Sequence, residues 1–138
     1  MKILTYEVEG RKKVGIWNRE ETWIYPLESF GMEYRDMQEV IESVSDSEIQ
    51  LLNHMAAKDP YKIKGAAPME QVKILAPIEK PGQDVICLGI NYMAHGEESA
   101  RYKKEAFNGE RPHAIYFSKR VNHCTADKEG IPAHEDMV

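Results

Sequence analysis

The sequence predicts an α+β protein built from two parts. Alternating polar and apolar residues occupy positions 1–27, which is the pattern of strands with one buried face. Apolar residues three and four positions apart follow over residues 37–56, which is the pattern of amphipathic helices. A nearly unbroken apolar run at residues 85–90 then indicates a strand of another kind. We therefore expect a small strand-and-helix domain over residues 1–75 and a second domain over residues 76–138.

Three short strands are expected at the start of the first domain. Apolar residues alternate with more polar ones at Leu4, Tyr6 and Val8, and a turn follows at residues 9–10. The alternation then resumes and continues as far as Tyr25. Short strands joined by such turns predict a β-meander.

Two helices are expected next, because their apolar residues share one face of a helix. Asp36, three residues before Glu39, is a suitable N-cap for the first helix. Ser45 and Glu48 have the spacing of a capping box at the start of the second. The residues that form the two apolar faces are Met37, Val40, Ile41 and Val44, and then Ile49, Leu52, Met55 and Ala56.

Further strands are expected in the second part of the chain. Residues 72–78 form an apolar strand that ends in proline, and residues 85–90 are long enough for a buried strand. A charged, helix-like run covers residues 97–106, and residues 112–119 again have the composition of a strand. Between them, the end of the apolar run leads directly into polar and titratable residues.

Charge and composition argue against several classes of protein. The chain has 18 Lys and Arg against 23 Asp and Glu, so a broad surface for nucleic acid or anionic membrane is not expected. The longest apolar run is far shorter than the ~20 residues that span a bilayer. The start of the chain becomes polar too early for a signal peptide. Cys87 and Cys124 are far apart and outside any CxxC motif, so we expect a reducing, cytoplasmic location.

His95 and Glu98 are the strongest candidates for chemistry. If residues 95–98 are helical, the two side chains lie three positions apart on one face and can pair. A carboxylate that holds one imidazole nitrogen raises the basicity of the other, which is the arrangement of a general base. The spacing also fits a surface pair without function, and that alternative stays open.

Several motifs stand in a fixed order between residues 70 and 138. An apolar strand ends in Gly-x-Asn-Tyr, a His and a Glu follow with two residues between them, and Phe-x-Lys comes later. The residues are Val72–Ile78, Pro81, Val85–Tyr92, His95, Glu98, Pro112, Phe117 and Lys119. This order and spacing resemble the fumarylacetoacetate hydrolase (FAH) family. Residues 1–69 carry none of these motifs and resemble the family only in general character. They have the strands and helices expected of the small domain that many bacterial members carry in front.

The resemblance implies a mainly β second domain and a metal-assisted enzyme acting on 2-oxo or 1,3-dicarbonyl acids. The reaction would be hydrolysis of a carbon–carbon bond, as with acylpyruvate or fumarylacetoacetate, or isomerisation of the 2-hydroxyhepta-2,4-diene-1,7-dioate type, in aromatic catabolism. His95 would be the base and Glu98 its partner. Asn91, Tyr92 and Lys119 would occupy supporting positions. Which keto acid is used, and whether the reaction is hydrolysis, isomerisation or decarboxylation, stays open.

The sequence departs from the family in its metal ligands. The resemblance implies that Mg²⁺ or Mn²⁺ is held by a Glu-x-Glu strand, and no such strand precedes Val138 in the right context. Residues 134–136 supply only adjacent side chains, which converge poorly on one ion. We therefore expect the ligands to lie beyond residue 138. On that reading the chain is the front part of a longer enzyme, binds no metal tightly and is inactive alone.

A second reading belongs to another class of protein. The chain could be complete and serve as a non-catalytic interaction or dimerisation module, whose exposed sheet edges need a partner. For the enzyme we expect a small keto acid as substrate. On either reading we expect a second copy of the chain as partner, and neither nucleic acid nor membrane. An unrelated small α+β domain is the third alternative.

Overall fold

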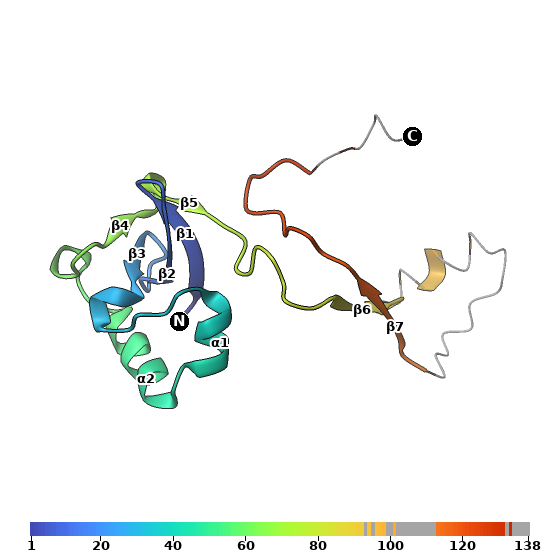
Figure 1. Ribbon diagram of the computed structural model, residues 1–138, viewed down its shortest axis with the longest axis horizontal. Coiled ribbons are helices and arrows are strands. Elements are labelled where there is room, and N and C mark those ends of the chain that lie inside the picture. The colour runs from blue at the N-terminus through green and yellow to red at the C-terminus, as the bar shows by residue number, and fades with distance from the viewer. Residues whose placement is uncertain (93, 95, 99–100, 102–112, 132, 134–138) are drawn as a thin grey trace. The chain divides into compact units, whose positions relative to one another are not determined.

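Both helices and strands are present in the computed structural model, so the predicted α+β class is confirmed (Figure 1). The structure describes the whole chain except residues 93, 95, 99–100, 102–112, 132 and 134–138. The chain folds as two compact units, residues 1–79 with 124–138 and residues 80–123. The predicted boundary near residue 76 and the FAH-type arrangement of the second domain stay predictions.

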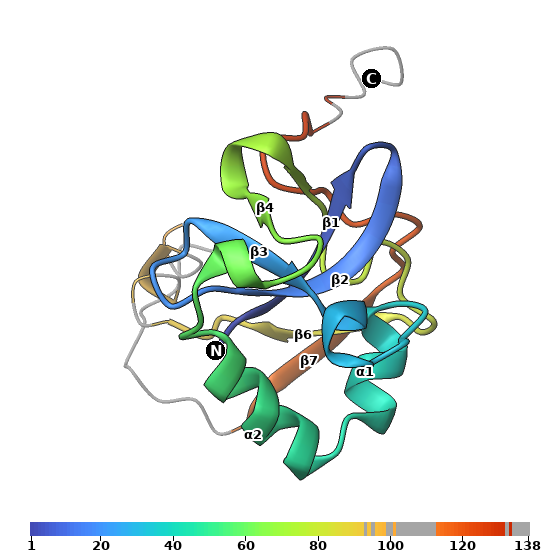
Figure 2. The same ribbon diagram turned by 90° about the vertical axis from the view of Figure 1, so that its left-hand side faces the viewer.

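Five antiparallel strands form the sheet of the first unit (Figure 2). The predicted meander is confirmed as β1 (Ile3–Val8), β2 (Arg11–Trp17) and β3 (Trp23–Pro26). Two short strands, β4 (Ala67–Pro68) and β5 (Lys73–Ile74), pair with its outer strands. The strand order is therefore β4-β3-β2-β1-β5. The pairing of β4 with β3 had no signal in the sequence.

The two predicted helices are confirmed as α1 (Met37–Ser43) and α2 (Asp46–Met55). The capping box is also present, since Ser45 and Glu48 each accept the other's backbone N–H. These bonds satisfy N–H groups that a helix start otherwise leaves without partners. The described residues of this unit also form three short 3-10 helices: η1 (Leu27–Phe30), η2 (Pro60–Lys62) and η3 (Met69–Gln71).

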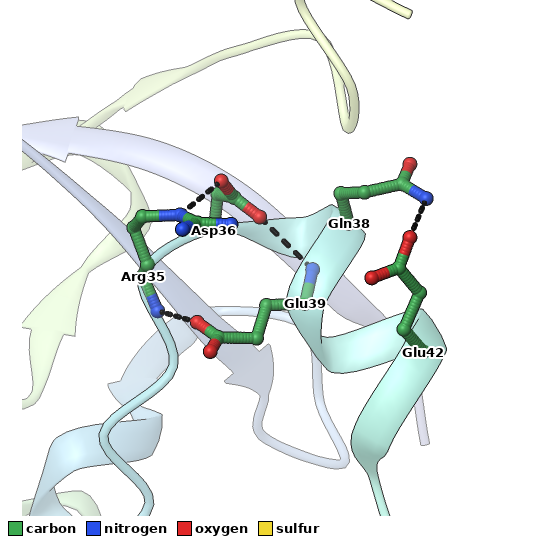
Figure 3. A network of polar contacts seen from close by, with 5 residues as sticks. All are labelled: Arg35, Asp36, Gln38, Glu39 and Glu42. Carbon is green, nitrogen blue, oxygen red and sulfur yellow. Dashed lines mark hydrogen bonds and ion pairs between the residues drawn. The ribbon is translucent and has the colours of Figure 1, made fainter. Parts of the chain in front are cut away.

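A network of polar side chains holds the start of α1 (Figure 3). The carboxylate of Asp36 accepts the backbone N–H of Glu39 at 2.9 Å and the Nε–H of Arg35 at 3.0 Å. Glu39 in turn accepts the backbone N–H of Arg35 at 2.6 Å, and Gln38 donates to Glu42 at 2.6 Å. The bond from the Glu39 backbone, and after it the bond from Arg35, lowers the pKa of Asp36.

The main core lies between one face of the sheet and the two helices (Figure 2). Alternate residues of a strand face the same side, so the apolar positions of β2 and β3 meet the apolar stripes of α1 and α2. Tyr25 is fully buried in this core, and its hydroxyl donates to the carbonyl of Lys58 at 2.7 Å. The buried members are Val14, Ile16, Tyr25, Leu27, Met32, Met37, Val40, Leu52 and Ala56.

A smaller cluster covers the opposite face of the sheet, where Leu4, Tyr6 and Ile24 are buried. Gly15 lies beneath this cluster and needs to be glycine. A Cβ there would lie 2.7 Å from the carbonyl oxygen of Tyr25 and 2.9 Å from Cε1 of Tyr6. The missing side chain is therefore what lets the Tyr6 ring lie against the backbone of β2.

The strand predicted over residues 72–78 is shorter than expected, because β5 has only two residues. The chain continues beside β1, where Leu75 donates its N–H to the carbonyl of Thr5 at 3.0 Å. The Thr5 hydroxyl then donates to the carbonyl of Pro77 at 2.8 Å. Proline has no N–H to return, so the ladder ends there.

The second unit contains an antiparallel pair of strands, β6 (Val85–Gly89) and β7 (Ile115–Lys119), which we call the ribbon. Both strands were predicted, but the predicted burial of residues 85–90 is wrong. Ile86 and Tyr116 are 67% and 69% exposed, and their neighbours along the ribbon are exposed or half-buried. A ribbon of two strands has two open faces, and the described residues of this unit cover neither.

The helix predicted over residues 97–106 is partly described. Residues 94, 96–98 and 101 are helical, and most of the rest lie outside the described residues. Across the part of the chain that the structure describes, no helix has the length and apolar character needed to span a membrane.

Candidate functional site

The predicted motif begins at the end of β6. A Cβ on Gly89 would lie 3.3 Å from Cγ2 of Ile115, so glycine allows the close approach of β7. Ile90 follows with a φ of 49°, a left-handed conformation that is rare for a β-branched residue. Backbone strain of this kind concentrates at functional sites. Sequence reasoning missed it, because isoleucine gives no signal for positive φ.

The strained turn leads into the first turn of a helix. Asn91 and Tyr92 lie before its helical residues and are both exposed, and the carbonyl of Tyr92 accepts the N–H of Gly96 at 3.0 Å. Glu98 is helical and exposed. His95 lies outside the described residues, so the pairing of His95 with Glu98 stays a prediction.

Lys119 lies at the other end of the ribbon. It is opposite Val85 in the register, whereas Asn91 follows Gly89. Four residues of a strand separate these two ends by about 13 Å. The Nζ of Lys119 lies 5.6 Å from the ring centroid of Phe117 instead. The structure therefore does not bring Lys119 beside Asn91, and its supporting role stays a prediction.

The described residues do not include a candidate metal centre. No three His, Cys, Asp or Glu side chains among them gather closely enough to hold an ion. Residues 134–136 lie outside the described part of the chain. The described residues thus offer no donor set to which Mg²⁺ or Mn²⁺ could be fitted.

A cavity of about 450 Å³ lies in the first unit, among residues of β2, η1 and the start of α1. Its volume falls in the range of small-molecule sites. The cations at its rim are already paired, since Lys13 lies 2.6 Å from Glu28, and Arg35 contacts Asp36. Neither of these two cations is therefore left without an acidic partner for an anionic ligand to replace.

No family model matches the sequence, and no curated protein matches it. The resemblance to the FAH family therefore rests on the order and spacing of the residues themselves.

Proposed function

We propose that this chain is the front part of a metal-dependent enzyme that resembles the FAH family and acts on 2-oxo or 1,3-dicarbonyl acids. The observation that supports this most is the strained turn after Gly89, which presents Asn91 and Tyr92 and leads into the helical turn of Glu98. Reactive groups are often carried by such connections, because a rigid strand fixes their origin. The reaction is hydrolysis of a carbon–carbon bond or isomerisation of a similar diacid.

In this proposal His95 is the general base. The carboxylate of Glu98 accepts the N–H of one imidazole nitrogen, which fixes the tautomer and raises the basicity of the other nitrogen. That nitrogen takes a proton from water, whose oxygen attacks the substrate carbonyl. The carbon–carbon bond then breaks, and its electron pair leaves with the other fragment as an enolate, which takes the proton back from His95. Asn91 and Tyr92, exposed on the same turn, hold the substrate by hydrogen bonds.

A divalent cation would add positive charge beside the substrate oxygens. Because the described residues offer no donor set, the proposal assigns the ion to none of them. We also propose a cytoplasmic location, because the two cysteines are far apart in the sequence and outside any CxxC motif.

The first test is the intact mass of the protein in its source cell. A mass about twice the 15.9 kDa of this chain would support the enzyme proposal. A mass of 15.9 kDa would count against it and favour the second candidate below.

The second test compares two neighbouring carboxylates in the polypeptide that the cell makes. Glu98→Gln should lower kcat for acylpyruvate hydrolysis with Mg²⁺ by ~10²-fold or more, and so should His95→Ala. Glu97→Gln is the matched control, because Glu97 is also exposed and helical but lies outside the i, i+3 spacing to His95. Equal turnover in the Glu97 and Glu98 variants would reject the dyad.

A non-catalytic interaction or dimerisation module is the second candidate. The observation that favours it is the ribbon, whose apolar side chains are exposed on both faces. Exposed apolar surface of this kind commonly marks an interaction site.

A further inference from the structure

The left-handed conformation after β6 falls on the least suitable of three neighbouring residues. Glycine and asparagine adopt a positive φ readily, whereas a β-branched side chain makes it costly. Gly89 and Asn91 have no positive φ, yet Ile90 between them has a φ of 49°. The conformation therefore follows from what the chain does at this point and not from the type of residue that occupies it.

Both neighbours of Ile90 have another role. Gly89 is the last residue of β6 and lies opposite Ile115, and its missing side chain allows the close approach of that residue. This contact needs Gly89 to keep the extended conformation of a strand. Asn91 is exposed, and in the proposed reaction its side chain binds the substrate. The change of chain direction is thus left to the backbone of Ile90.

The conformation of Ile90 sets the direction of the chain after β6. Residues of a strand advance about 3.3 Å each, so an extended Ile90 would carry the chain onward past the end of the ribbon. A residue in the left-handed conformation turns the chain instead. The helical turn follows directly, since the buried Gly96 donates its N–H to the carbonyl of Tyr92 at 3.0 Å. The exposed side chains of Asn91, Tyr92 and Glu98 therefore all follow from this one turn.

We propose that Ile90 is a positioning residue for the proposed reaction, and that it acts through its positive φ and not through its side chain. It fixes the direction in which Asn91 and Tyr92 leave β6 and the start of the helical turn that carries Glu98. A displacement of about 1 Å at a reacting group can lower a rate ~10²-fold, which is a physical reason to keep a strained turn here. The proposal rests on the proposed enzyme function, to which it adds a residue.

The first test separates the backbone conformation of residue 90 from its side chain. Ile90→Asn and Ile90→Pro both remove the isoleucine, but asparagine tolerates a positive φ, whereas proline fixes φ at about −65°. In the polypeptide that the cell makes, Ile90→Pro should lower kcat for acylpyruvate hydrolysis with Mg²⁺ by ~10²-fold. Ile90→Asn should keep kcat within ~3-fold of the wild type. Gln83→Pro is the matched control and should also keep kcat, because Gln83 is exposed in the bend before β6 and has no positive φ.

The second test measures the position of the helical turn without reference to turnover. The N–H of Gly96 is protected from hydrogen exchange only while its bond to the carbonyl of Tyr92 is formed. In isotope-labelled protein followed by NMR, Gly96 should exchange ~10-fold or more faster in Ile90→Pro than in the wild type. In Ile90→Asn and in Gln83→Pro its exchange rate should stay that of the wild type.

Two results would overturn the role of Ile90. An equal loss of kcat in Ile90→Asn and Ile90→Pro would show that the side chain acts and not φ. Unchanged kcat, or unchanged exchange of Gly96, in Ile90→Pro would show that φ positions nothing. Either result can occur while Glu98→Gln still lowers turnover, and then only the role of Ile90 fails. If the Glu97 and Glu98 variants have equal turnover, the dyad fails instead, and the exchange of Gly96 still tests Ile90 by itself.

Discussion

The two units of the chain contain strands of similar apolar content and bury them very differently. In the first unit Ile16, Tyr25 and Leu52 have no exposed surface, because α1 and α2 cover the sheet. In the second unit Ile86 and Tyr116 are largely exposed, because no described residues pack as a second layer against the two strands of the ribbon. Apolar strands thus form a core only where a second layer meets them, and the predictions below test that difference.

The largest difference is expected in cooperative unfolding, when residues 1–79 and residues 80–123 are made as separate polypeptides. Residues 1–79 contain every buried apolar residue of both core clusters, so they should unfold in one cooperative transition. Residues 80–123 should show none. Thermal unfolding followed by circular dichroism measures both. A sigmoidal transition in residues 80–123, or its absence in residues 1–79, would contradict the comparison.

A matched pair of leucines tests the same difference within the whole chain. Leu52→Ala in α2 should lower the free energy of unfolding by about 2–5 kcal/mol, because it leaves a cavity in a closed core. Leu88→Ala in the exposed ribbon should cost less than about 1 kcal/mol. Urea unfolding followed by far-UV circular dichroism, which reports on the strands of both units, gives both values. Equal losses would show that the ribbon is buried after all.

Alkaline pH should destabilise the first unit through Tyr6. Burial, and then the charge of Glu28, raises the pKa of Tyr6 to about 12. The unfolded chain releases this proton near pH 10. Stability is therefore full below pH 10 and falls as the pH rises toward 12, by up to roughly 2–3 kcal/mol.

The variant Tyr6→Phe should remove that part of the alkaline loss. At pH 7 it should keep or slightly increase stability, because the buried hydroxyl has no hydrogen-bond partner to lose. Tyr116→Phe in the ribbon is the control. It should change neither the alkaline loss of stability nor the free energy of unfolding at pH 7. Urea unfolding at pH 7, 10 and 11.5 tests this, and an unchanged alkaline loss in Tyr6→Phe would rule out the assignment.

The smallest effect is expected at the start of α2. Ser45→Ala removes one half of the capping box and should cost about 1 kcal/mol in unfolding free energy. Ser118→Ala in β7 should cost less than about 0.5 kcal/mol, because its side chain is exposed. Urea unfolding of both variants measures the two losses of unfolding free energy. A larger loss in Ser118→Ala than in Ser45→Ala would contradict the prediction.

Local chemistry alone was enough to predict most elements of the first unit. The alternation through Leu4 and Tyr6 predicted the meander, and Asp36 and Ser45 marked both helix starts. Caps, turns and apolar periodicity act over three or four residues, so their consequences can be worked out before the fold is known. The candidate motif, from Gly89 to Glu98, was likewise located from the order and spacing of residues in the sequence.

Tertiary structure decided what depends on residues far apart in the chain. The addition of β4 to the sheet, the strained φ of Ile90 and the exposure of the ribbon had no local signal. The register of β6 with β7 also separated Lys119 from Asn91, although both belong to one sequence pattern. A pattern specifies which residue types occur in which order, whereas distances and burial follow from which strands pair and what covers them.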